Sequence, residues 1–81
     1  MHESAAAQQI VRTVLSEAGR RRATEVTSVD VEIGELDGFR EVALREAFAI
    51  EAKGTPLEHT TLNVHVRAGR GLVIQRASFV T

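Results

Sequence analysis

The chain has 81 residues, ten basic and eleven acidic side chains, a formal net charge of −1 and no cysteine. This length predicts a single domain, spanning residues 1–81, with a modest core. The balanced charge argues against a nucleic-acid or membrane partner, and the lack of cysteine excludes disulfides and cysteine-bound zinc. No segment approaches the ~20 apolar residues of a membrane span and no signal peptide is visible, so we expect a cytoplasmic protein.

The segment SAAAQQIVRTVLSEAGRRR, residues 4–22, predicts a helix. Ser4 is the expected N-cap, and Gly19 is the expected residue beyond the C-cap. The arginines at 20–22 fit a helix C-terminus, where positive charge is favourable, better than they fit a nucleic-acid patch. Apolar residues recur at spacings of three and four and should form one buried stripe: Ala7, Ile10, Val11, Val14, Leu15 and Ala18.

The next segment, TEVTSVDVEIGEL at residues 24–36, alternates between apolar and polar side chains. Alternation with a period of two is typical of a half-buried strand. Val29, Val31 and Ile33 should therefore face the core, and the strand should stop at Gly34.

After Asp37-Gly38, the segment FREVALREAFAIEAKG at residues 39–54 returns to helical spacing. Asp37 is a candidate N-cap for this second helix. Gly54, with Pro56 two residues beyond it, indicates where the helix ends. The residues that carry the helical spacing are Val42, Ala43, Ala47, Phe48 and Ile50.

The last third predicts a β-hairpin. Residues 61–67 alternate, residues 68–71 supply a turn that contains glycine, and residues 72–80 form the returning strand. The returning strand is apolar on both faces. The sequence therefore leaves two sets of residues that could face the core: Leu72 and Ile74, or Val73, Ala77 and Phe79. The order α-β-α-β-β predicts an α+β fold with a three-stranded mixed sheet and two helices on one face.

No arrangement of residues typical of an enzyme is present, and we expect that the protein is not an enzyme. The serines lack the context of a nucleophile elbow. Gly69-Arg70-Gly71 lacks the later glycine and the following helix of a dinucleotide-binding fingerprint. His59 and His65 should be solvated, because no second ligand lies at a short regular spacing from either.

The first three residues, Met1, His2 and Glu3, form a candidate metal site. A free α-amine at Met1, the amide nitrogen of His2 and the His2 imidazole can chelate one metal through a five-membered and a six-membered ring. The Glu3 amide or carboxylate could supply a fourth donor. Nitrogen-rich square-planar coordination suits Ni(II) or Cu(II), and metal affinity should fall below neutral pH because the donors must lose protons. An alternative role for Glu3 is a favourable interaction with the helix dipole.

Three segments together resemble the HypA family of hydrogenase nickel-incorporation proteins. They are the Met-His-Glu start, VTSVDVEIGELDG at residues 26–38, and ALREAF with KGTPLE within residues 43–58. Their order and spacing extend the resemblance over residues 1 to about 60, and it resumes at Gly71-Leu72.

The resemblance implies a nickel metallochaperone that takes part in maturation of a nickel enzyme such as [NiFe]-hydrogenase. Its implied partners are the nickel-enzyme precursor and a helper GTPase, and its implied metal ligands are Met1, His2 and Glu3. Some family members also bring a carboxylate near the site from the loop before the second helix. The corresponding position here is Arg40, with Asp37 and Glu41 nearby.

Family members interrupt the last two strands with a zinc domain built on two Cys-x-x-Cys pairs, whereas this chain has a turn at residues 68–71. We therefore expect the protein to bind nickel but no zinc. We also expect residues 1–81 to form the nickel-binding base domain of the family, which folds here without zinc. An alternative is a metal-independent protein–protein interaction or regulatory module, with a homodimer formed through an open sheet edge as one possibility.

Overall fold

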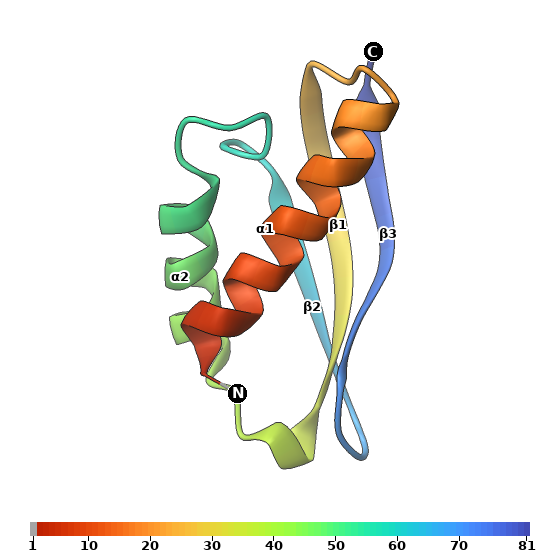
Figure 1. Cartoon of the computed structure of the whole chain (residues 1–81). Helices are drawn as coiled ribbons and strands as arrows, with labels where there is room; N and C mark the ends of the chain where they lie inside the picture. Colours follow the sequence, from red (N-terminus) through yellow and green to blue (C-terminus); the bar gives the residue numbers. More distant parts are fainter. Residues whose placement is uncertain (1) are drawn as a thin grey trace.

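The computed structural model describes residues 2–81. It contains α1 (Glu3–Arg20), β1 (Glu25–Gly34), the 3-10 helix η1 (Glu35–Asp37), α2 (Glu41–Ala52), β2 (Thr61–Arg67) and β3 (Leu72–Val80). The three strands form one mixed sheet in the order β2-β1-β3, and both helices lie on the same side of it (Figure 1). The predicted element order and architecture are confirmed.

Helix α1 buries the stripe that its sequence predicts. Ala7, Ile10, Val11, Val14 and Ala18 are in the core, together with Ala6, and Leu15 is half-buried against them. This stripe is buried because residues three and four apart share one face of a helix.

Both predicted caps of α1 are wrong. The helix begins earlier than Ser4, because the His2 carbonyl already accepts the Ala6 amide at 3.0 Å and makes His2 the N-cap. The helical bonding also runs past Gly19, and the chain turns away at Arg22, whose φ of 54° is left-handed.

The predicted stripe of α2 is correct in part: Phe48 is buried and Ala43 and Ala47 are half-buried, but Val42 and Ile50 face away from the core. Leu44, Phe48 and Ala52 are buried, whereas Val42 and Ile50 are 69% and 75% exposed. A helix turns about 100° per residue, so Val42 lies on nearly the opposite side from Leu44. The predicted end near Gly54 is confirmed within two residues.

Strand β1 is the centre of the sheet. It pairs with β2 in parallel and with β3 antiparallel. Val29, Val31 and Ile33 are buried as predicted, and Val26 joins them. All four pack against the helices as part of one core.

The prediction that β2 and β3 form a hairpin is wrong. These strands lie on opposite sides of β1, and residues 68–71 cross over its end. Gly34 allows this crossing, because a Cβ at that position would overlap the backbone of Gly69 and Arg70. Gly69 and Gly71 adopt φ values of +94° and +106°, which residues with a Cβ rarely adopt.

A bulge in β3 decides which of its faces is inward. Ile74 pairs with Val31 and Arg76 pairs with Asp30, which leaves Gln75 as an extra residue. The bulge shifts the alternation by one position. Both predicted faces therefore contribute: Leu72 and Ile74 pack inward before the bulge, and Ala77 and Phe79 do so after it.

Candidate metal centre

His2 lies at the start of α1 in a position open to solvent. Its backbone is extended, with φ −82° and ψ 156°, and its side chain makes no capping hydrogen bond. The first amide groups of a helix have no partner within the helix. A metal could therefore bind the amide nitrogens of His2 and Glu3 without breaking a helical hydrogen bond. Met1, the other member of the predicted site, lies outside the described residues.

Glu3 connects the start of α1 to the start of α2. Its carboxylate Oε2 accepts a hydrogen bond of 3.3 Å from the backbone amide of Arg40, the N-cap of α2. The Glu3 side chain is half-buried in this contact. One carboxylate thus lies near the N-termini of two helices, where negative charge is favourable. The helix-dipole role expected for Glu3 is consistent with this position.

Residues 34–40 link this end of α1 to residues 68–71, the turn that crosses over the end of β1 and is called the crossover turn below. The Asp37 carboxylate accepts the Gly71 amide at 2.7 Å, and the Leu36 amide donates to the Gly69 carbonyl at 2.9 Å. The prediction that Asp37 is the N-cap of α2 is therefore wrong, since Arg40 occupies that position. The Asp37 side chain holds the turn instead.

The additional carboxylates near the site are already paired. Asp37 binds Gly71, and Glu41 forms an ion pair of 3.3 Å with Arg45 one helical turn further on. The side chain at position 40 is an exposed arginine, so only its backbone amide meets Glu3. The acidic residue within the first turn of α1 is Glu3 itself.

The other histidines are exposed, as expected. Across residues 2–81, no group of three or more His, Cys, Asp or Glu side chains is arranged to hold a metal ion. Within the same residues, no helix has the length and apolar character needed to cross a membrane.

The sequence did not indicate the contact between Glu3 and Arg40 or the one between Asp37 and Gly71. Each joins residues more than thirty positions apart. The only local signal was the short interruption at Asp37-Gly38 between the first strand and the second helix.

Comparison with known families gives one consistent match. The family described as "Hydrogenase/urease nickel incorporation, metallochaperone, hypA" matches residues 1–73. Curated relatives carry the name hydrogenase maturation factor HypA. The protein from Methanopyrus kandleri is 36% identical over 69 residues, which are 85% of this chain and 49% of that protein. The one from Archaeoglobus fulgidus is 39% identical over 66 residues, which are 82% and 60% of the two chains.

A third relative, from Ignicoccus hospitalis, is 44% identical over 69 residues, or 82% of this chain and 49% of that protein. The chain thus spans about half to three fifths of the length of these three relatives. The fold also matches the solution structure of the Ni metallochaperone HypA from Helicobacter pylori, with a TM-score of 0.72 and 13% identity. That match covers 100% of this chain and 95% of the other.

Proposed function

The chain belongs to the hydrogenase and urease nickel-incorporation family HypA, and from this premise we propose that it binds Ni(II) at its N-terminus as cargo for a nickel enzyme. The proposed ligands are the Met1 α-amine, the amide and imidazole of His2, and a fourth donor from Glu3. The nickel-enzyme precursor and a helper GTPase are its proposed partners, in the cytoplasm. The protein is a maturation factor and not an enzyme.

The exposed, extended His2 at the N-cap is the observation that carries this proposal. An extended residue before the first turn leaves its amide nitrogen and its ring on the outside of the helix. The Glu3–Arg40 bond fixes the residue that follows. A metal bound here remains at the surface, where a second protein can take it.

Isothermal titration with Ni(II) tests the site on protein whose first residue is Met1. His2→Ala should lower affinity by at least tenfold because it removes one of the strongest donors. A glycine added before Met1 should do the same, since it separates the amine from the His2 chelate. His59→Ala is the matched control, because His59 is an exposed histidine elsewhere in the chain. Equal affinity in all four proteins would refute the proposal.

We further propose that this base domain folds without zinc. The chain contains no cysteine, and its last two strands are joined directly by residues 68–71. Backbone bonds from Gly34 and Leu36, together with the Asp37 carboxylate, hold that turn. Thermal unfolding should therefore be unchanged by a chelator such as EDTA, whereas a structural zinc would make the melting temperature fall.

A metal-independent interaction module is the second candidate. Its support is the exposure of Leu36, Val42 and Ile50 at 60%, 69% and 75%, together with the two edges of the sheet. Size-exclusion chromatography with light scattering, with and without Ni(II), separates the two candidates. A dimer that forms equally with and without metal, in protein that does not bind Ni(II), would favour the module.

A further inference from the structure

The far end of α1 borders an open groove of about 400 Å³ between this helix and β3. Val14, Ile74 and Phe79 are among the apolar residues that line it, and three arginines, Arg20, Arg21 and Arg76, line it as well. Glu17 is the single acidic residue in the lining. The groove is thus locally basic although the whole chain has a net charge of −1.

The groove follows the outer edge of the sheet. It is lined by four consecutive residues of β3, at positions 74–77. Ile74 and Ala77 pack against the core, whereas Gln75 and Arg76 beside the bulge are exposed, so a groove that touches all four reaches the outer edge of the strand. Strand β3 is an edge strand of the β2-β1-β3 sheet, and its outer backbone groups have no neighbouring strand. Such an edge suits an extended segment, which can pair with it through backbone hydrogen bonds.

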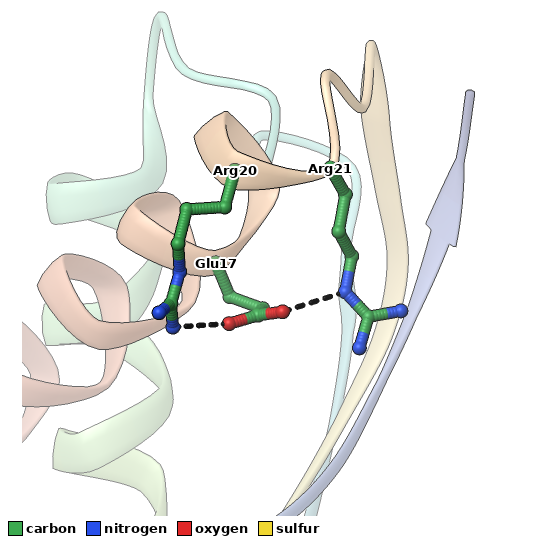
Figure 2. Close-up of polar contacts among 3 residues, drawn as sticks. All are labelled: Glu17, Arg20 and Arg21. Carbon is green, nitrogen blue, oxygen red and sulfur yellow. Dashed lines mark hydrogen bonds and ion pairs between the residues drawn. The ribbon is translucent and has the colours of Figure 1, made fainter.

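Glu17 already occupies part of the basic site. Its two carboxylate oxygens contact the guanidinium groups of Arg20 and Arg21, at 2.5 and 2.7 Å (Figure 2). Each of these ion pairs involves one guanidinium nitrogen, so most of the five N–H donors on each arginine remain for another acceptor. Among residues 2–81, Arg76 forms no ion pair. The groove therefore offers more positive donors than Glu17 satisfies.

Phe79 orients one of these arginines. The Arg21 guanidinium carbon lies 4.7 Å from the centre of the Phe79 ring, a cation–π geometry. The ring is half-buried on β3. This contact holds the Arg21 charge over the groove, where it would face a bound ligand.

From this arrangement we propose that the groove between α1 and β3 binds an extended acidic segment of a partner protein. Its carboxylates pair with Arg20 and Arg21, and its apolar side chains cover Ile74 and Phe79. Glu17 lies fourteen residues after Glu3 on the same helix, which is about 21 Å along the axis. The groove is therefore separate from the N-terminal residues proposed to bind Ni(II), and neither proposal depends on the other.

Fluorescence anisotropy with a labelled synthetic peptide of alternating glutamate and valine tests the proposal on the full chain. The double variant Arg20→Gln/Arg21→Gln should weaken binding about tenfold, the combined effect of two partly exposed ion pairs. Glu17→Gln should act in the opposite direction and tighten binding about threefold, because it removes a competing carboxylate. Two variants with opposite effects cannot both be explained by partial unfolding.

Arg12→Gln is the matched control, because Arg12 is an exposed arginine on the same helix outside the groove. It should leave peptide binding unchanged, and the same peptide with glutamine in place of glutamate should bind at least tenfold more weakly. Amide chemical shifts should change at residues 74–77 and not at residues 2–3. Equal losses in the Arg12 and Arg20/Arg21 variants would overturn the proposal. Preferential binding of single-stranded DNA over the acidic peptide would also overturn it.

Discussion

The two ends of α1 differ in how their charged residues are held. At the N-terminal end, Glu3 binds the backbone of Arg40, and Asp37 in the same connecting segment binds Gly71. These contacts join distant parts of the chain. At the C-terminal end, Glu17 binds Arg20 and Arg21 within one helical turn. The helix dipole favours the sign of charge at both ends, so the dipole does not account for the difference.

The two ends of α1 therefore differ in how easily their charged side chains can rearrange. Long-range contacts join Glu3 to the start of α2 and Asp37 to the turn at residues 68–71, so their geometry exists only in the folded protein. Local contacts between exposed side chains are weak and rearrange at little cost. A fixed end suits the placement of metal ligands, whereas an adaptable basic end suits the exchange of one carboxylate for another.

The largest expected effect comes from closing the space at Gly34. Gly34→Ala should reduce the free energy of unfolding by about 2–3 kcal/mol, because the added Cβ meets the backbone of Gly69 and Arg70 and cannot be relieved by a side-chain rotation. For a chain of this size the melting temperature should fall by about 10–20 °C. Differential scanning calorimetry measures both quantities.

Gly19→Ala, near the C-terminal end of α1, is the matched control for Gly34→Ala. Nothing lies within 4 Å of a Cβ added there, and the residue is helical. Alanine should therefore stabilise the protein by about 0.5 kcal/mol through its higher helix propensity. If Gly34→Ala were no more destabilising than Gly19→Ala, the close crossing of the turn over β1 would be wrong.

The second effect concerns the Asp37–Gly71 bond. Asp37→Asn keeps the shape of the side chain but removes its charge, and charge-assisted hydrogen bonds are roughly twice as strong as neutral ones. Unfolding free energy should fall by about 1 kcal/mol, measured by urea denaturation. The Gly71 amide should also exchange faster with solvent, while binding of the acidic peptide at the other end should not change.

Glu46→Gln is the control for that experiment, because Glu46 is an exposed carboxylate on α2 without an ion pair among the described residues. It should change stability by no more than about 0.5 kcal/mol. Equal losses in both variants would mean that the Asp37 effect reflects overall charge and not its bond to Gly71.

The third effect separates the two roles open to Glu3. Its carboxylate already accepts the Arg40 amide, so we expect its backbone amide to be the donor to Ni(II). Glu3→Gln should lower stability by about 0.5 kcal/mol through the lost charge at the helix N-terminus. It should change nickel affinity less than threefold in calorimetric titration. A loss of tenfold or more would assign the carboxylate as a ligand.

Local patterns predicted the elements, while contacts between distant residues decided how they join. The stripe of α1 and the alternation of β1 follow from helical and strand periods, and both were predicted correctly. Strands β2 and β3 were predicted to pair, because a short turn with glycine has the same local sequence whether it joins paired strands or crosses a third strand. Gly34 is the residue that permits the crossing, and its role depends on a turn more than thirty residues away.

At the candidate metal site too, local features were predictable and contacts between distant residues were not. Chelate chemistry indicated His2 and Glu3 from three adjacent residues, and the resemblance to one family supported that interpretation. The surroundings of Glu3 were not predictable, since Arg40 approaches through its backbone amide and not through its side chain. The groove at the other end of α1 was also missed. The arginines at 20–22 were interpreted only as a helix terminus, and Phe79 was assigned only as a possible core residue.

The smallest expected effect is a pH dependence at the C-terminal end of α1. The hydrogen bond from Arg21, assisted by the charge of Arg20, lowers the pKa of Glu17 from its usual value of 4.5. A carboxyl group whose pKa is lower in the folded protein stabilises the fold above its unfolded pKa. That contribution is lost as the pH falls through the folded pKa. Glu17→Gln should therefore be slightly less stable than the parent protein at neutral pH and equal to it once Glu17 is protonated. Urea denaturation from pH 7 down to pH 3 measures the difference. A gap of the same size at every pH would mean that Glu17 stabilises this end by packing, and its carboxylate would then not be readily exchanged for that of a partner.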